Sequence, residues 1–289
     1  MIEIRTLNFA YHKTRVIKDM NLTIHKGEIF GLLGPSGAGK STVQRIMIGS
    51  LRTYEGSVRL FAKEAKELKD RDYHLIGVQP EVPQFYSKYT ALENLKFFSS
   101  MYEGVEVDIS YWVKRVGLEE DIHKRVSDYS KGMKTRLNFI RSVLHHPSIL
   151  FLDEPTSGLD PINQKIIKDI IQEMNALGVT IVITTHNMKD VEDLCHRIAF
   201  INHGKILAEG AINEFLHASP LHQIRVVVED SGLLETEVVE LKHLFTDKYK
   251  DLAEKNKIRL IQSDASSLND VFIRLAEEGD EEIVQKSLE

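Results

Sequence analysis

The clearest pattern along the chain is a set of short, almost continuous apolar runs, separated by stretches with helical spacing. The runs EIFGLLG (28–34), ILFLDE (149–154) and VTIVITTH (179–186) are typical of buried strands. Between the last two, QKIIKDIIQEMNAL (164–177) places its apolar residues on one helical face. Strands of this kind alternating with helices predict a parallel sheet covered by helices.

Other segments add strands around this sheet. IEIRTLNF (2–9) and LTIHKGEIF (22–30) alternate in polarity, which predicts an N-terminal antiparallel β part. Further short strands are expected at SVRLF (57–61) and LIGV (75–78). RIAFINHGKILAEG (197–210) resembles a closing hairpin whose turn is His203-Gly204.

The pattern changes to helix from about residue 85 to 145. ALENLKFFSSMY (91–102), DISYWVKRVGL (108–118) and KGMKTRLNFIRSVLHH (131–146) are the expected helices. We therefore predict a helical insertion at about 82–145. Its aromatic residues lie at helical spacing and are expected in the core, namely Phe97, Phe98, Tyr111 and Trp112.

After Gly210 the pattern predicts a smaller unit of alternating strands and helices. The strands are IRVVVED (224–230) and IRLIQS (258–263), with a long polar helix at about 233–256 between them and a last helix in SLNDVFIRLAEE (267–278). We place the boundary near 211–220, which gives domains of 1–210 and 211–289.

Residues 31–42, GLLGPSGAGKST, contain the candidate chemistry. Gly34, Gly39, Lys40 and Ser41 fit the pattern G-x-x-x-x-G-K-S/T between a predicted strand and a predicted helix. Glycines allow a tight turn whose N–H groups surround phosphate oxygens, while the lysine reaches the outer phosphates and the serine reaches Mg²⁺. The alternative is a simple tight turn, which the lysine and serine in register do not favour. The expected nucleotide-binding residues are Gly34, Pro35, Ser36, Gly37, Ala38, Gly39, Lys40, Ser41 and Thr42.

A phosphate loop needs a metal partner and a group that positions water, and ILFLDE ends in two acids. Asp153 can hold Mg²⁺ together with Ser41, and Glu154 can polarise the attacking water. Taken alone, the two acids would be read as a solvated strand end. Asp153 lies 113 residues after Lys40, and the two acids are followed by PTSGLD (155–160), which favours the catalytic interpretation.

Composition limits the other possibilities. The net charge is -6, so nothing global attracts nucleic acid or anionic lipid. Cys195 is the only cysteine, which excludes an internal disulfide and agrees with a reducing compartment. No segment approaches the ~20 apolar residues that cross a bilayer. We therefore expect a cytoplasmic protein.

Taken together, these segments resemble the ATP-binding-cassette (ABC) ATPases, in the family's order over about residues 2–210. SDYSKGMKTR (127–136) resembles the signature segment, with Ser130, Lys131 and Gly132 in its central positions. Lys131 departs from the usual glycine there, and Met133 stands where glutamine is common. LDEPTSGLDP (152–161) resembles the joined magnesium strand and D-loop, with Asp160 as its aspartate.

Two further positions follow from the resemblance. His186 resembles the switch histidine that contacts the γ-phosphate, although one histidine of twelve could equally be a core or capping residue. Tyr11 falls where the family stacks a ring on adenine, although it could simply pack on the sheet. The implied fold is α/β: a P-loop NTPase parallel sheet core with an N-terminal antiparallel β part, a helical insertion and a small C-terminal α+β extension.

The glutamine position of the family's Q-loop has three candidates in LIGVQPEVPQFY, namely Gln79, Glu81 and Gln84. Gln79 matches by residue type, but counting five residues from Ile76 selects Glu81. A carboxylate is a hard oxygen donor suited to Mg²⁺. We therefore expect the Mg²⁺ ligands to be Ser41, Glu81 and Asp153.

The resemblance implies a catalytic set of Lys40, Glu154 and His186, with ATP and Mg²⁺ as cofactors. It also implies that two copies, or a copy and a close paralogue, pair head to tail, so that Ser130 and Gly132 of one close the ATP of the other. A separately encoded membrane permease is the expected second partner, at the inner face of the cell membrane, with Phe85 and Tyr86 as contact candidates. No nucleic acid is expected.

The C-terminal segment SSLNDVFIRLAEEG (266–279) resembles the tail of export ATPases of the daunorubicin-resistance kind. It favours an export ATPase, with a regulatory or dimer-steadying role for the extension. The alternatives are an ABC-type ATPase acting on ribosomes or nucleic acid, and a non-catalytic scaffold. The single cassette and the absence of sustained heptads argue against the first, and the presence of Lys40 and Glu154 against the second.

Overall fold

The structure is a computed structural model of the 289-residue chain. It describes residues 1–102, 104–217, 223–230, 233–263, 268 and 271–272. The chain forms two compact units, Met1–Glu209 and Gly210–Glu289, which are described separately. In the part of the chain described, no helix is both long and apolar enough to cross a membrane.

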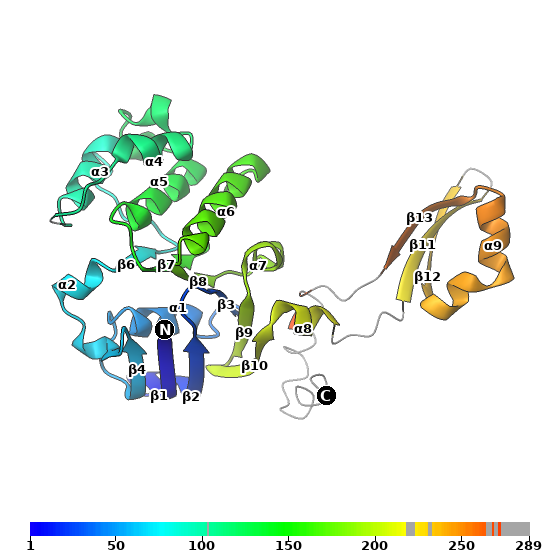
Figure 1. Ribbon diagram of the computed structural model, residues 1–289, viewed down its shortest axis with the longest axis horizontal. Helices are drawn as coiled ribbons and strands as arrows, with labels where there is room; N and C mark the ends of the chain where they lie inside the picture. The colour runs from blue at the N-terminus through cyan, green and yellow to red at the C-terminus, as the bar shows by residue number, and fades with distance from the viewer. Residues whose placement is uncertain (103, 218–222, 231–232, 264–267, 269–270, 273–289) are drawn as a thin grey trace. The chain divides into compact units, whose positions relative to one another are not determined.

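The first unit is built on a six-stranded sheet with the order β10-β9-β3-β8-β7-β6 (Figure 1). Neighbouring strands from β9 to β6 pair in parallel, which confirms the predicted α/β fold. β9 and β10 form the closing pair, and His203 and Gly204 at their turn both have positive φ. The strands are β3 (Ile29–Leu33), β6 (Ile76–Gln79), β7 (Ile149–Asp153), β8 (Thr180–Thr184), β9 (Arg197–Asn202) and β10 (Lys205–Ala211).

A second, four-stranded antiparallel sheet has the order β2-β1-β4-β5. Its strands are β1 (Ile2–Tyr11), β2 (Thr14–Ile24), β4 (Glu55–Leu60) and β5 (Lys63–Glu64). Helix α1 (Lys40–Met47) lies between the two sheets, and Val43 and Ile46 of α1 belong to one buried cluster with Phe30 and Phe151 of the large sheet. Packing in this core holds α1 against the parallel sheet and so fixes the position of its first residue, Lys40.

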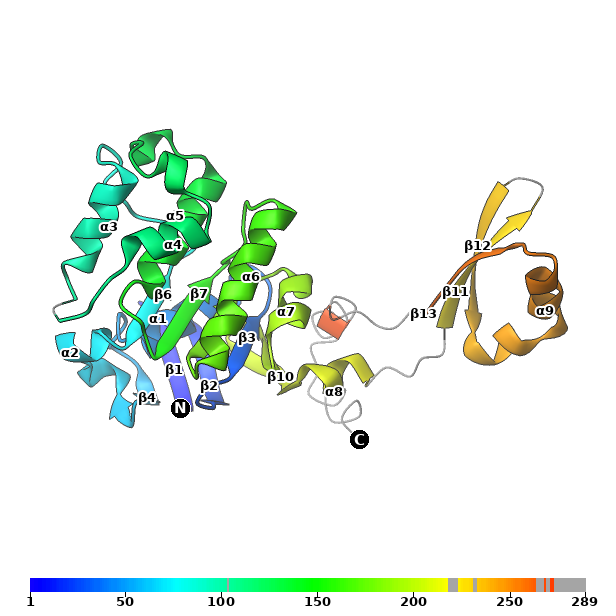
Figure 2. The ribbon, with the colours of Figure 1, turned by 45° about the horizontal axis from the view of Figure 1, so that its top comes forward.

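The other face of the large sheet is covered by helices α6 and α7, which lie side by side (Figures 1 and 2). Because residues alternate along a strand, Leu150 and Leu152 face these helices while Phe151 faces α1. α6 (Pro161–Ala176) begins with Asp160 as its N-cap and proline in its first turn, and α7 (Met188–Leu194) begins with Asn187 as its N-cap.

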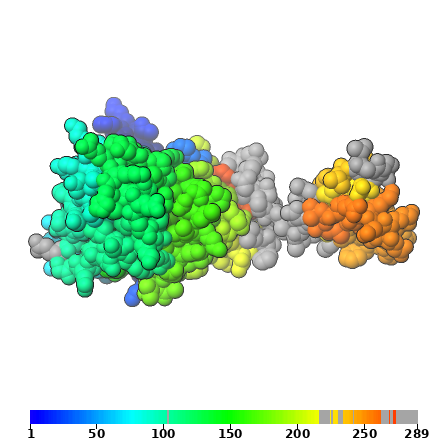
Figure 3. All heavy atoms as spheres, turned by 90° about the horizontal axis from the view of Figure 1, so that it is seen from above, coloured from blue at the N-terminus to red at the C-terminus, as the bar shows by residue number. Residues whose placement is uncertain are grey.

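The predicted helical insertion is present. It contains α3 (Ala91–Ser99), α4 (Ile109–Arg115) and α5 (Lys131–Val143), and the short helix α2 (Asp70–Tyr73) precedes it. In the space-filling view of Figure 3 these cyan to green residues form one continuous surface of the first unit. Of its aromatic residues, Trp112 is buried as predicted, whereas Phe97 and Tyr111 are exposed at 40% and 46%. Helical spacing alone does not show which face of a helix is buried in the core.

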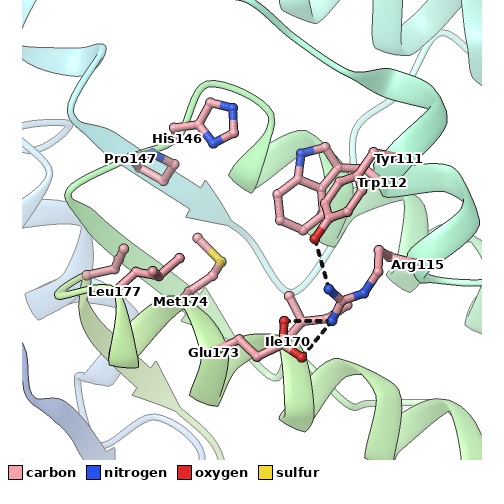
Figure 4. Close-up of a pocket in the computed structure, with 10 residues that line it drawn as sticks. Tyr111, Trp112, Arg115, His146, Pro147, Ile170, Glu173, Met174 and Leu177 are labelled. Atoms are coloured by element: carbon pink, nitrogen blue, oxygen red, sulfur yellow. Dashed lines mark hydrogen bonds and ion pairs between the residues drawn. The ribbon is translucent and has the colours of Figure 1, made fainter.

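A cavity of about 420 Å³ separates α4 from α6 (Figure 4). At its edge the Arg115 guanidinium donates to both carboxylate oxygens of Glu173 at 2.9 Å and to the Tyr111 hydroxyl. This ion pair joins the insertion to α6. None of the residues that line the cavity belongs to the phosphate loop.

The second unit is a three-stranded antiparallel sheet with the order β12-β11-β13 and helix α9, preceded in the chain by α8. Its elements are α8 (Ile212–His217), β11 (Gln223–Asp230), β12 (Leu233–Glu240), α9 (Asp247–Glu254) and β13 (Ile258–Ser263). The prediction of one long helix at 233–256 is wrong, because its first third is strand β12. Most of the segment 266–279 lies outside the described residues.

The strand at 233–240 forms because its β-branched residues find a partner that sequence alone does not show. Thr236, Val238 and Val239 pair with β11 in an unbroken antiparallel register. Val239 packs against the small core around Val226 and Tyr249. The alternation of charged and β-branched residues thus reflects a half-buried strand rather than a polar helix.

A fully buried amide holds the start of the insertion, and its loss gives a prediction. Asn94 Oδ1 accepts from the Tyr86 N–H at 2.9 Å, and its Nδ2 donates to the Tyr86 and Thr90 carbonyls. We expect Asn94→Ala to lower the free energy of unfolding by about 1–3 kcal/mol, because buried polar partners lose their bonds. Urea unfolding measures this. Lys96→Ala, on the exposed side of the same helix, is the control and should change stability by less than about 0.5 kcal/mol; equal effects would contradict the anchoring role.

Candidate functional site

The phosphate-loop motif lies where predicted, between the end of β3 and the start of α1. Gly34 has a φ of 154°, and a Cβ there would come within 2.1 Å of the Ile201 carbonyl oxygen. Gly39, at φ 110°, would meet the side chain of Ile17 at 2.7 Å. Both the conformation and the close approach therefore require glycine at these two positions.

The loop presents backbone donors at the start of α1. Ala38 N–H donates to the Pro35 carbonyl, whereas no hydrogen bond among the described residues engages the N–H groups of Gly37, Gly39 or Lys40. The first N–H groups of a helix lack partners and carry partial positive charge, which favours an anion.

Lys40 brings an ammonium group to the same loop. Its Nζ donates to the carbonyls of Gly34 at 2.7 Å and Pro35 at 3.0 Å. Burial lowers the pKa of Lys40, while the carboxylates of Glu154, Asp153 and Glu81 act in the opposite direction. Three carboxylates thus act on the charge of Lys40, so the loop and these acids form a single site.

Asp153 is the acid next to the loop. Its Oδ2 accepts from Ser41 Oγ at 3.4 Å, and its Oδ1 accepts a short hydrogen bond from the Thr184 hydroxyl. Burial raises the pKa of Asp153; the Thr184 bond lowers it, and the charge of Glu81 raises it again. A carboxylate in such surroundings is stabilised in its charged form by a nearby cation.

The donor set at this point fits magnesium. Asp153 and Ser41 offer hard oxygen ligands side by side, with Glu81 close enough to act electrostatically on both Asp153 and Lys40. In the chain as described, no group of three or more His, Cys, Asp or Glu residues could hold a metal ion. Mg²⁺ commonly binds through one or two carboxylates and takes its other ligands from phosphates and water.

Glu154 and His186 form the second pair of the site. Glu154 Oε1 lies 2.6 Å from His186 Nδ1 and also accepts the His186 backbone N–H at 3.0 Å. Its Oε2 accepts from Thr185 Oγ1 at 3.1 Å. The Glu154 side chain is 13% exposed while that of His186 is 80% exposed. The carboxylate is thus held in a fixed orientation and the imidazole faces solvent.

Gln79 and Glu81, two of the candidates for the Q-loop glutamine position, have different surroundings. Gln79 ends β6, pairs with Leu152 of β7 and is only 1% exposed. Glu81 is exposed and acts electrostatically on Lys40 and Asp153. Glu81 therefore lies near enough to the loop and the acids to act on their charges, whereas Gln79 is buried at the end of β6.

The signature and D-loop residues serve locally as helix caps. Ser130 Oγ accepts the Met133 N–H at the start of α5, and Asp160 accepts the Ile162 and Asn163 N–H groups at the start of α6. A Cβ on Gly132 would approach the Gly158 carbonyl at 3.0 Å. Within the described residues none of the three bonds to the phosphate loop, so in one chain they stand apart from it.

Tyr11 ends β1 with 39% of its surface exposed. Its ring makes an edge contact with Phe9, with 4.7 Å between the ring centres. The residue is therefore partly exposed to solvent, as a stacking residue needs.

Sequence reasoning missed the two threonines that orient the acids. Thr184 bonds Asp153 and Thr185 bonds Glu154, and both belong to the apolar run VTIVITTH. A signal was present, because two hydroxyls end a strand that is otherwise apolar, at the same sheet edge as the acids.

Comparison with known proteins gives the family of the chain. The profile of the ABC transporter family matches residues 17–157. A fluoroquinolones export ATP-binding protein of Mycobacterium tuberculosis is 43% identical over 279 residues, which are 95% of this chain and 93% of that protein. The bacitracin transport ATP-binding protein of Enterococcus faecalis is 34% identical over 249 residues, 86% of this chain and 80% of that protein.

A solved dimeric bacterial ABC transporter cassette has the same fold, with a TM-score of 0.67 and 26% identity. The match covers 73% of this chain and 99% of that one.

Proposed function

The chain belongs to the ABC transporter family and is an ATP-binding protein of that family, and from this we propose that it is the ATPase subunit that drives export through a separately encoded membrane permease. The observation that supports it most is the joining of a phosphate loop, a metal-binding acid and a held carboxylate in one site. Its relatives named above are an export protein and a transport protein. These names do not favour the alternative of action on ribosomes or nucleic acid.

The proposed binding step uses the loop and Lys40. The N–H groups of residues 34–42 surround the phosphates of ATP, and the Lys40 ammonium exchanges its two carbonyl partners for phosphate oxygens. Tyr11 offers its ring to the adenine. Ser41, Asp153 and Glu81 would hold Mg²⁺, which supplies charge neutralisation at the phosphates when bound.

The proposed hydrolysis step uses Glu154 and His186. Glu154 orients a water molecule and accepts its proton, because three hydrogen bonds hold its carboxylate in place. The imidazole of His186 is exposed, and the ring nitrogen that does not face Glu154 can point toward the γ-phosphate. Ser130, Gly132 and Asp160 do not reach the loop in one chain, so we assign them to the ATP of a second copy or close paralogue, paired head to tail.

The coupling step needs a surface for the permease. Tyr86, Tyr89 and Phe97 form an exposed cluster of aromatic rings, in which Tyr86 lies 5.7 Å from Tyr89 and 5.1 Å from Phe97. Phe85 is half-buried against Phe98 and Arg141. We therefore place the docking surface on Tyr86 and its neighbours, on the cytoplasmic side of the membrane. The extension 211–289 is assigned a regulatory or dimer-steadying role.

Glu154→Gln should bind ATP as well as the wild type but lose at least about a hundredfold in turnover, because the phosphate cradle stays while the proton acceptor is lost. ATPase rates together with calorimetric nucleotide affinity measure this. The variant should also form ATP-dependent dimers on gel filtration. A wild-type rate in Glu154→Gln would remove it from catalysis.

Glu81 and Gln79 can be separated by a magnesium titration of ATPase activity. Glu81→Gln should still turn over but need severalfold more Mg²⁺, because a negative charge near Asp153 is lost, and Glu81→Ala should impair activity strongly. Gln79→Ala should leave the Mg²⁺ midpoint unchanged, although its buried position makes a loss of stability expected. A silent Glu81→Ala beside a damaging Gln79→Ala would reverse the assignment.

The docking surface is tested by affinity capture of the tagged protein from detergent-extracted membranes of its own host. Tyr86→Asp should lose an integral membrane partner that the wild type retains, because a charge in an aromatic contact is costly. Leu177→Asp is the control, since Leu177 is 86% exposed and belongs to another part of the first unit. Loss of the partner in the control, or its retention by folded Tyr86→Asp, counts against this surface.

A further inference from the structure

We propose that Asp190 is a positioning residue for hydrolysis, because it ties the turn that follows Glu154 to the helix that follows His186. The inference rests on the proposed function and concerns how the Glu154–His186 pair is held. It assigns Asp190 no contact with substrate.

The tie is a direct hydrogen bond between two buried side chains. Thr156, two residues after Glu154, donates a short hydrogen bond from Oγ1 to Oδ2 of Asp190, which lies four residues after His186. Thr156 is 3% exposed and Asp190 is 1% exposed. One carboxylate therefore connects the segments that carry both members of the pair.

A third segment neutralises this carboxylate. Lys168 of α6 places its Nζ 2.5 Å from Asp190 Oδ1 and 2.9 Å from Asp193 Oδ2. Burial acts to lower the pKa of Lys168, but its bonds to Asp190 and Asp193 outweigh burial and raise it. The lysine stays charged, so the buried Asp190 carboxylate is compensated.

The pair needs such a tie because sheet pairing ends before it. β7 and β8 end at Asp153 and Thr184, and Glu154 has a φ of 49°, a conformation that non-glycine residues rarely adopt. A strained residue keeps its conformation only when its surroundings hold it. The Glu154 backbone N–H bonds to the Thr184 carbonyl on one side, and the Thr156–Asp190 bond holds the turn on the other.

The competing explanation is that the group only stabilises the fold, as many buried ion pairs do. A stability measurement cannot separate the positioning role from the purely structural role, because both predict a lower free energy of unfolding when Asp190 is changed. They differ in what happens to turnover once a folded variant is compared at saturating ATP. A positioning role lowers kcat and leaves KM unchanged, while a purely structural role leaves kcat per folded molecule unchanged.

The experiment compares variants of the full chain in steady-state ATP hydrolysis. Thr156→Val keeps shape but removes the hydroxyl, and it should lower kcat about ten- to a hundredfold with KM within about twofold. Thr156→Ser restores the hydroxyl and should restore kcat to within about threefold. Asp190→Leu removes the acceptor of the same hydrogen bond and, in folded protein, should lower kcat as Thr156→Val does. Lys189→Ala, an exposed residue on the same helix, is the control and should leave kcat unchanged.

A double-variant cycle tests whether the effect passes through Glu154. In the Glu154→Gln background, Thr156→Val should cause no further loss of the residual rate, since the group that it positions is gone. Multiplied losses would overturn the inference, as would a folded Thr156→Val with wild-type kcat. A wild-type rate in Glu154→Gln overturns the catalytic assignment and this inference with it, whereas an inactive Glu154→Gln beside an unaffected Thr156→Val overturns the inference alone.

Discussion

The parallel pairing of β7 with β8 is the constraint on which the site depends. Asp153 pairs with Thr184, so the last residues of two strands 31 positions apart meet at one edge of the sheet. One step further along each strand, Glu154 reaches Thr185 and His186. A register shift of one residue would turn these side chains to opposite faces and separate all of the acids from the loop.

Burial and charge act against each other around this edge, and their balance suits a phosphate ligand. Lys40 is shifted toward its neutral form by burial, and Asp153 toward its neutral form as well. Each therefore gains when an opposite charge arrives: phosphate for the lysine, a divalent cation for the aspartate. In the proposed function MgATP brings both opposite charges at once, so the site suits the complex better than either component alone.

The sequence predicts those parts of the molecule that a short stretch of neighbouring residues is enough to identify. The phosphate loop, the strand before it and the acids of ILFLDE are each recognisable within a dozen residues, because glycine, lysine and acid spacing follow from the loop's own geometry. The roles of Thr184 and Thr185 are not local, since they depend on which strand lies beside β7. The same limit explains the wrong helix at 233–256, where pairing with β11 decided the structure, and the exposure of Phe97, which helical spacing could not settle.

Lys131 shows how a departure from the family pattern can be used within one chain. Its Nζ donates to Ser157 Oγ at 3.2 Å, and its methylene groups pack so close to Gly158 that a Cβ there would come within 2.9 Å of one of them. Thr135 of the same helix donates to the Ser157 carbonyl. A glycine at 131 could make no such side-chain bond, so the lysine adds a link between the start of α5 and the turn after Glu154. Thr156 bonds the same turn to α7, so one turn contacts both the start of α5 and the helix that follows His186.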